Sequence, residues 1–308
     1  MLQAVLLSIA GLIGLAIGGE LLVRGAVGIA QKLGVSTLFT GLVIVGFATS
    51  MPEMVASVQA SLAGSPEIAW GNIIGSNLAN TLLILGASAL VAPIILTGTG
   101  RRDAIFALAA TLLLWALALS QLGARWVGVA LLIGIVGYIV WRYRYPGASV
   151  PEDGEGDAPQ KALFALALFI GGLVVLVLGG DALVKGAIAL ATIFEVPETV
   201  IGLTVVAVGT SLPELAASIA AALRGKSGLA LGNVVGSNIY NILLIGGTTM
   251  TIAPFALPVE LAGVQMALLT ISALALLLLL WFADRIGRIL GAVLVAAFAA
   301  NVIFVFSA

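Results

Sequence analysis

The chain has 308 residues, of which 61% are hydrophobic and 9% are charged, and its net charge at pH 7 is −1. So little polar surface excludes a soluble globular domain, because apolar stretches long enough to cross a bilayer recur along the chain. The sequence contains no cysteine and no histidine, which excludes disulfides, thiolate and imidazole ligands and histidine proton shuttles. We therefore expect an all-α integral membrane protein that is not an enzyme, has no cofactor, and contacts lipid rather than nucleic acid.

A spanning helix needs about 20 residues. The apolar pattern predicts ten of them, at 3–30, 37–62, 69–91, 103–120, 125–143, 162–190, 199–223, 229–252, 262–282 and 286–306. No basic segment precedes the first helix, so we expect it to be retained rather than cleaved as a signal peptide.

The one long polar stretch, 144–161, is rich in proline, glycine and acidic residues. It predicts an unstructured cytoplasmic linker between a first five-helix half, 1–143, and a second, 162–308. A regulatory Ca²⁺ site in the linker is the alternative. The acidic residues of the linker are Glu152, Asp153, Glu155 and Asp157. They lack the spacing of an EF-hand loop, so a solvated linker is favoured.

The two halves contain one sequence twice. Residues 41–86 align without a gap with residues 202–247, and 23 of the 46 pairs are identical. The matches fall largely on polar and helix-breaking positions, such as Thr-Ser-Met-Pro-Glu at 49–53 and Thr-Ser-Leu-Pro-Glu at 210–214. Because each half has an odd number of predicted helices, the second enters the bilayer from the opposite side. The sequence thus predicts two inverted repeats with a polar site where they meet.

The distribution of Lys and Arg predicts the orientation. If the N-terminus is outside, the internal loops hold ten basic residues and the external loops hold only Arg125. Both termini are therefore expected outside, in a multi-pass protein of the cell inner (plasma) membrane.

Pro52 and Pro213 lie inside the second and seventh predicted helices, where each removes a backbone hydrogen bond. We expect both helices to be broken or kinked there, over 46–52 and 207–213, with carbonyl oxygens freed near the middle of the bilayer. The neighbouring hydroxyls belong to Thr49, Ser50, Thr210 and Ser211. A structural kink whose freed groups are satisfied by these hydroxyls is the alternative.

Glu53 and Glu214 follow the two prolines directly. An ionised carboxylate inside a bilayer costs at least about 2.5–3.5 kcal/mol, so each needs a partner. The second, third, seventh and eighth predicted helices offer no basic partner. No Lys, Arg or His occurs in 37–62, 69–91, 199–222 or 229–252. The partner is then a bound cation or a proton, and a pair kept neutral by two structural protons is the alternative.

The third and eighth predicted helices carry polar residues at i, i+4 and i+8, which places them on one face of each helix. These are Asn72, Ser76 and Asn80, repeated as Asn233, Ser237 and Asn241. We expect Ser76, Asn80, Ser237 and Asn241 at the site. Asn72 and Asn233 are expected to hold helices together or to line the entrance.

A second symmetric set lies on the first and sixth predicted helices. Glu20 and Arg24 on one helix correspond to Asp181 and Lys185 on the other, each pair at i, i+4. These pairs are expected to be structural, with a gating role as the alternative.

Ligands that are all oxygens favour hard cations such as Na⁺, Ca²⁺, Mg²⁺ or Mn²⁺. Two glutamates and one freed carbonyl from each repeat would supply about six oxygens and two negative charges, which suits Ca²⁺ best.

The motifs Gly-Thr-Ser-Leu-Pro-Glu at 209–214 and Gly-Asn-Val-Val-Gly-Ser-Asn at 232–238 recur in the first half as Ala-Thr-Ser-Met-Pro-Glu and Gly-Asn-Ile-Ile-Gly-Ser-Asn. This doubled pattern resembles the alpha repeats of the Ca²⁺/cation antiporters, and most closely those of prokaryotic Na⁺/Ca²⁺ exchangers. The resemblance implies Ca²⁺ binding by Glu53 and Glu214 with the Thr49 and Thr210 carbonyls. It implies Na⁺ sites that draw on these glutamates and on Ser50, Ser76, the Gly46 carbonyl, Ser211, Ser237, Thr210 and the Ala207 carbonyl, with Asn80 and Asn241 between them.

The resemblance also implies alternating access, in which the first and sixth helices slide across a rigid core. Many members have an Asp at the position of Asn241, so its absence predicts transport without K⁺ and a surplus positive charge when three Na⁺ bind. H⁺-coupled exchange of Ca²⁺ or Na⁺ is the main alternative. A cation channel and an intramembrane carboxyl protease are more distant ones. The sequence leaves the oligomeric state open.

Overall fold

The computed structural model describes residues 1–96, 100–146, 161–194 and 207–307. These residues are helical except for turns and one two-residue ladder. In the first half the elements are α1 (Leu2–Leu33), α2 (Thr37–Phe39), the π-helix η1 (Thr40–Val45), α3 (Gly46–Thr49), α4 (Met51–Leu62), α5 (Pro66–Leu78), the π-helix η2 (Ala79–Ile84), α6 (Leu85–Val91), β1 (Ile94–Ile95), α7 (Arg101–Ser120) and α8 (Arg125–Arg144).

The second half repeats much of this order. Its described elements are α9 (Ala162–Ile193), α11 (Ala207–Gly209), α12 (Leu212–Leu223), α13 (Ser227–Ile239), the π-helix η4 (Tyr240–Ile245), α14 (Gly246–Ile252), the 3-10 helix η5 (Val259–Ala262), α15 (Val264–Phe282), β2 (Arg285–Ile286) and α16 (Arg288–Ser307).

Eight helices of the described chain are long and apolar enough to cross a membrane. A ninth span results if Thr37–Thr49 and Met51–Leu62, which meet at 43°, are counted together. The remaining predicted span, 199–223, begins among residues that lie outside the described ranges. Its described part includes α12, which has 12 residues and is too short to cross a bilayer alone.

Local sequence sets the helix ends. α1 stops at Gly34, which has φ 65°, a left-handed conformation that glycine adopts without steric cost. The Ser36 hydroxyl then accepts a hydrogen bond from the Phe39 amide at 3.1 Å and caps the next helical segment. Prolines stand in the first turns of α4, α5 and α12, where no intrahelical amide bond is lost.

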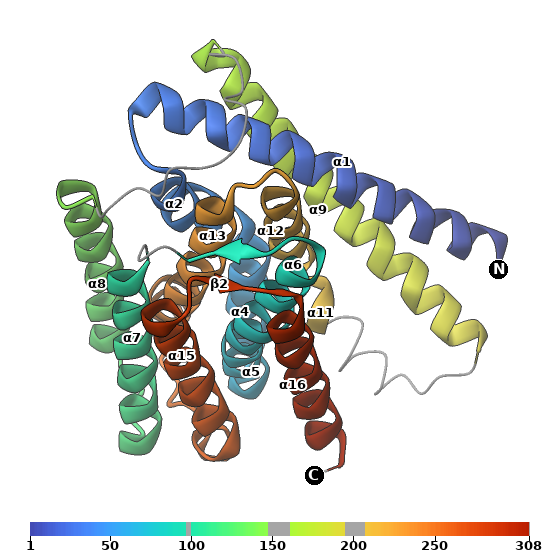
Figure 1. The fold of residues 1–308 in the computed structure, drawn as a ribbon. Coiled ribbons are helices and arrows are strands. Elements are labelled where there is room, and N and C mark those ends of the chain that lie inside the picture. Colours follow the sequence, from blue (N-terminus) through green and yellow to red (C-terminus); the bar gives the residue numbers. More distant parts are fainter. Residues whose placement is uncertain (97–99, 147–160, 195–206, 308) are drawn as a thin grey trace.

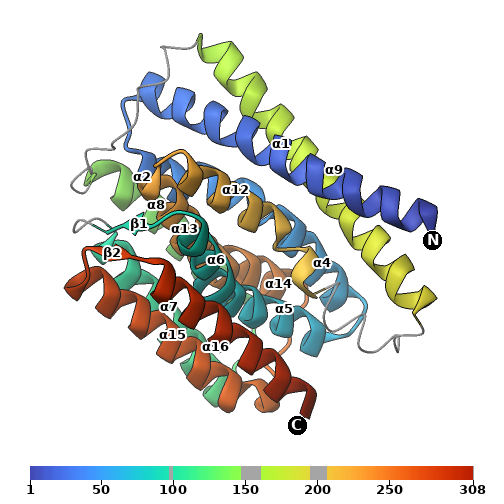
Figure 2. The same cartoon turned by 45° about the vertical axis from the view of Figure 1, so that its right-hand side comes forward.

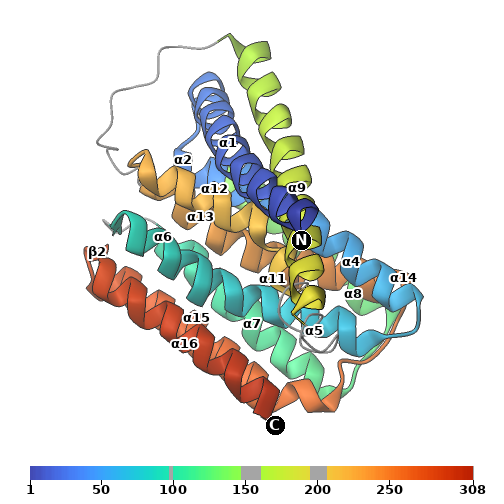
Figure 3. The ribbon, with the colours of Figure 1, turned by 90° about the vertical axis from the view of Figure 1, so that its right-hand side faces the viewer.

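α1 and α9 lie side by side as two long helices that cross one flank of the bundle, and they stay together in all three views (Figures 1, 2 and 3). Glycines form their interface, so the two backbones touch. A β-carbon at Gly14 would lie 2.9 Å from the Gly179 α-carbon, and one at Gly18 would lie 2.6 Å from the Leu176 amide nitrogen. Small residues of this kind let membrane helices pack closely. We refer to these two helices as the α1–α9 pair.

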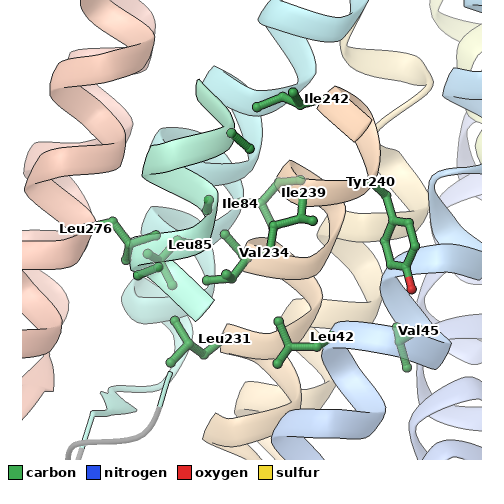
Figure 4. Packing of buried hydrophobic residues seen from close by; sticks show 14 of the residues in the cluster. Leu42, Val45, Ile84, Leu85, Leu231, Val234, Ile239, Tyr240, Ile242 and Leu276 are labelled. Atoms are coloured by element: carbon green, nitrogen blue, oxygen red, sulfur yellow. The ribbon is translucent and has the colours of Figure 1, made fainter. Parts of the chain in front are cut away.

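The centre of the bundle is α13, which continues through η4 into α14. Every residue of α13, from Ser227 to Ile239, is buried. η1 crosses α13 where Gly41 meets Gly232, since a β-carbon at Gly41 would lie 3.0 Å from the Gly232 α-carbon. Leu42 and Val45 of η1 pack beside Val234, Ile239 and Tyr240, with Ile84, Leu85 and Leu276 on the other side of α13 (Figure 4).

The loops after α6 and α15 pair as a short antiparallel ladder, a departure from the predicted all-helical chain. Ile94 pairs with Ile286, and the Leu96 amide donates to the Asp284 carbonyl at 2.7 Å. Pro93 follows the end of α6, and the extended residues after it satisfy backbone groups that a helix no longer covers.

An ion pair joins α7 and α8 in the interior. Arg142 Nε donates to Asp103 Oδ1 at 2.7 Å, and the Tyr138 hydroxyl donates to the same oxygen at 2.8 Å. The Arg142 and Asp103 side chains are 3% and 1% exposed. Neither residue was singled out by the repeat pattern, because neither has a charged counterpart in the other half.

Candidate cation site

Two helix breaks with the same backbone geometry frame the site. Ser50 lies between α3 and α4 with φ −79° and ψ 3°, and Ser211 precedes α12 with φ −89° and ψ 7°. Pro52 and Pro213 follow two residues later and lack the amide that would bond back across the break. The distortion is more local than the predicted segments, since Gly46–Thr49 is helical as α3 and Ala207–Gly209 is helical as α11.

Each break supplies a buried carboxylate that is held by a hydroxyl from the other half. The Ser211 hydroxyl donates to Glu53 Oε1 at 3.0 Å, and the Ser50 hydroxyl contacts Glu214 Oε1 at 3.4 Å. Glu53 and Glu214 are 1% and 2% exposed. The second carboxylate oxygen of each has no hydrogen-bond partner among the described residues. The crossed contacts bring four predicted site residues together.

Asn72 and Asn233 fix the backbone at the two glutamates. Asn72 Nδ2 donates to the Glu53 carbonyl at 3.2 Å and to the Ser57 hydroxyl at 2.9 Å. In the other half, Asn233 Nδ2 donates to the equivalent carbonyl at 3.2 Å and to the equivalent serine hydroxyl, Ser218, at 2.9 Å. The prediction that these asparagines hold helices together is confirmed by these contacts.

Thr49 joins the halves once more. Its hydroxyl has one proton to donate and lies 3.0 Å from the Val45 carbonyl oxygen and 3.2 Å from Asn233 Oδ1, so the two acceptors share that proton. Its counterpart Thr210 is half-buried between α11 and α12. Gly46 lies against α13, where a β-carbon would be 3.1 Å from the Ser237 amide nitrogen. Ala207 begins α11, and its side chain lies outside the described part of the chain.

The remaining predicted residues are buried but are not linked to the glutamates by a hydrogen bond within the described chain. Asn80 lies in η2 and Asn241 in η4, and π-helical turns of this kind occur frequently at functional sites. Both amide oxygens and the Ser237 hydroxyl are buried without a hydrogen-bond partner among the described residues. Ser76 is 5% exposed. Buried oxygens left in this way are costly unless a donor or cation reaches them.

Sequence reasoning missed one polar contact beside these residues. Asn238 Nδ2 donates to the Thr81 hydroxyl at 2.8 Å and so links α13 to η2. Asn77, the counterpart of Asn238, instead donates to the Ile73 carbonyl of its own helix at 2.9 Å. Thr81 corresponds to Ile242 in the second half, so the repeat comparison gives no sign of this contact.

The electrostatics of the site come from its two carboxylates. Across the described ranges, no ion pair involves Glu53 or Glu214, and no group of three or more Asp, Glu, His or Cys residues could hold a metal. Neutral hydroxyl, amide and carbonyl oxygens make up the rest of the surroundings. Such a donor set fits a hard cation rather than a thiophilic one.

Comparison with known proteins is consistent with this chemistry. The family described as sodium/calcium exchanger protein matches residues 3–144 and 164–307. The chain is 36% identical to the putative antiporter CaxA of Alkalimonas amylolytica, with 97% of each chain covered. It is 31% identical to the sodium/calcium exchanger MaX1 of Methanosarcina acetivorans, with 82% of this chain and 83% of the relative covered.

The fold is similar to that of a solved exchanger. A structure of the sodium-calcium exchanger NCX_Mj, soaked with zero Na⁺ and Ca²⁺, superimposes with a TM-score of 0.86 at 33% identity and covers 99% of each chain. Because the family match spans nearly the whole sequence and two relatives above 30% identity cover most of it, the chain belongs to the sodium/calcium exchanger protein family of multi-pass membrane transporters.

Proposed function

We propose that this protein is a secondary active antiporter that exchanges Na⁺ for Ca²⁺ by alternating access. The observation that carries the proposal is the pair of buried glutamates, Glu53 and Glu214. One carboxylate oxygen of each glutamate contacts a serine hydroxyl from the other half of the chain. The other oxygen of each has no hydrogen-bond partner among the described residues. Two such carboxylates without a basic partner in the described chain need a cation or protons to balance their charge, and in this proposal Na⁺ or Ca²⁺ does so.

The proposed ligand set follows from the contacts. Ca²⁺ binds between Glu53 and Glu214, assisted by the carbonyls of Thr49 and Thr210, because flexible oxygen coordination of about six or more suits this ion. Na⁺ ions use overlapping oxygens when Ca²⁺ is absent. These come from Ser50, Ser76, Asn80 and the Gly46 carbonyl in one half, and from Thr210, Ser211, Ser237, Asn241 and the Ala207 carbonyl in the other. The Ser237 hydroxyl and both asparagine oxygens lack other partners in the described structure, which supports their inclusion.

The charge of the site sets the proposed stoichiometry and selectivity. Two carboxylates neutralise one Ca²⁺, whereas three Na⁺ leave one positive charge, so a 3:1 exchange moves net charge across the membrane. Asn241 adds no charge for a further monovalent ion, and transport is therefore K⁺-independent. We further propose ten spans arranged as two inverted five-helix repeats, with a cytoplasmic linker over 144–161 and both termini outside the plasma membrane.

The test is ⁴⁵Ca²⁺ uptake into proteoliposomes that are given a Na⁺, K⁺ or H⁺ gradient in turn. We expect an outward Na⁺ gradient alone to drive uptake. Glu53→Gln and Glu214→Gln should each abolish this uptake, because the amide keeps the shape of the side chain and removes its charge. Glu67→Gln is the matched control, since Glu67 is exposed on the first turn of α5 and should leave uptake unchanged.

Wild-type uptake in either site variant would refute the proposed site. Uptake driven by a pH gradient without Na⁺ would instead favour an H⁺-coupled exchanger. Ca²⁺ flux without any counter-gradient would indicate a channel.

A further inference from the structure

A two-pronged polar contact joins the α1–α9 pair to α12. Arg224, which caps the C-terminus of α12, reaches Glu20 of α1 with two nitrogens. Its Nε donates to Oε2 at 2.8 Å and its Nη2 donates to Oε1 at 2.6 Å. Arg24 also donates to Glu20 Oε1, at 2.8 Å, but from the same helix. We call the Glu20–Arg224 contact the latch.

Small residues line the contact between α1 and α12 beside the latch. α1 lies on α12 through Gly19, where a β-carbon would be 2.9 Å from the Ala216 carbonyl oxygen and 3.3 Å from the Ala220 β-carbon. Small side chains of this kind present little barrier to one helix sliding along another. Forked hydrogen bonds between a guanidinium and a carboxylate depend on both separation and direction. The latch therefore favours one position of α1 along α12.

The equivalent contact does not form in the other half. Gly180 and Asp181 of α9 correspond to Gly19 and Glu20, yet the nearest atom to a β-carbon at Gly180 is the Leu212 β-carbon at 3.8 Å. Asp181 pairs with Lys185 on its own helix at 2.7 Å, and both side chains are more than half exposed.

The face of α4 that corresponds to the α12 surface is not covered by any of the residues that the structure describes. Val55, the counterpart of Ala216, is 52% exposed, and Gln59 and Ala63 are also exposed. Ala63 occupies the position of Arg224, so this face offers no cation to Asp181.

We propose that the latch is a conformational device that favours the position of the α1–α9 pair described here over the exchanged position, in which α9 lies on α4. The inference rests on the proposed alternating access, in which the pair slides as a unit between two related positions. The exchanged position breaks the latch and, because residue 63 is alanine, gains no ionic contact in return. The two positions of the pair therefore differ in free energy, although the two repeats are similar in sequence.

The test measures the position of the pair directly and needs no transport. The chain contains no cysteine, so cysteines introduced at Leu178 of α9 and Ile303 of α16 carry the only spin labels. Both native side chains are well exposed, at 62% and 68%. Electron–electron distance distributions are recorded on the full chain in nanodiscs at fixed Na⁺ concentration without Ca²⁺.

Glu20→Gln and Arg224→Gln should each raise the minor-to-major population ratio about fivefold, the effect expected for a partly exposed ion pair. Arg24→Gln removes the positive charge beside Glu20 on its own helix but leaves the Glu20–Arg224 contact in place, so it should not raise the ratio. Ala63→Arg should raise the same ratio by offering Asp181 a partner in the exchanged position, and Asp181→Asn in that background should cancel the gain.

Distributions of Glu20→Gln and Arg224→Gln that match the wild type would overturn the proposal, as would an Ala63→Arg effect that survives Asp181→Asn. Failure of the proposed ion exchange would give a different result. It would be seen in the Ca²⁺ uptake of the Glu53 and Glu214 variants and would leave the distances between the spin labels unaffected.

Discussion

The two asparagines that hold the glutamate backbones should differ in their contribution to stability. Among the described residues, the Asn233 side chain contacts the Glu214 carbonyl, the Ser218 hydroxyl and the Thr49 hydroxyl, whereas the Asn72 side chain contacts the Glu53 carbonyl and the Ser57 hydroxyl. Each bond contributes about 0.6–1 kcal/mol in a membrane interior. Asn233→Ala should therefore cost about 2–3 kcal/mol and Asn72→Ala about 1–2 kcal/mol. The same atoms are removed in both, so the loss of side-chain volume largely cancels in the comparison.

The assay is reversible unfolding of the purified protein in mixed micelles with added SDS, followed by circular dichroism. Thr49→Val, introduced into the wild type and into Asn233→Ala, completes a double-mutant cycle that isolates the bond between the halves. We expect a coupling energy of about 0.6–1 kcal/mol with Asn233 and none with Asn72. An Asn72→Ala variant as unstable as Asn233→Ala, together with zero coupling, would refute the reasoning.

Three further predictions concern charge. Asp103→Asn should destabilise the protein by about 3–5 kcal/mol in the same assay, because it leaves Arg142 buried without its carboxylate; a smaller loss than for an exposed pair such as Asp181→Asn would contradict this. An inside-negative valinomycin potential should speed Na⁺ entry coupled to Ca²⁺ exit, at about 2.3 kcal/mol per charge per 100 mV, and a flux that ignores the potential would mean electroneutral exchange. Asn241→Asp should alter the ion selectivity of ⁴⁵Ca²⁺ uptake at normal expression, whereas a K⁺ requirement in the wild type would argue against the charge count.

The sequence predicted the helices well where apolar runs end at helix-breaking residues. The predicted spans 125–143 and 229–252 appear as 125–144 and 227–252, each within two residues. The described helical segments are interrupted at Ser50 and Ser211, close to Pro52 and Pro213, and two broken spans within a ten-helix plan stay a prediction. The extent of the interruptions did not follow from the sequence, because helical turns persist up to Thr49 once α13 packs against them.

Contacts that have no counterpart in the other repeat could not be predicted from the sequence. Glu20 was expected to pair with Arg24, and it does, but its pairing with Arg224 joins residues that are distant in sequence and unrelated by the repeat. The ladder at Ile94 and the buried pair at Asp103 escaped notice for the same reason. The site itself was predicted from repeated polar residues, and the assignment of its individual ligands stays a prediction.

The contact between α1 and α9 has a consequence for synthesis. Gly14 reaches its partner Gly179 only after more than 160 further residues have been made. At about 5–20 residues per second, the glycine face of α1 stays without its partner for roughly 10–30 s. During that interval lipid must cover a helix that has too little side-chain volume to fill the space beside it. Gly41 and Gly86 wait still longer, because their contacts at Gly232 and Gly291 are made later, so assembly of this bundle must wait for the second half of the chain.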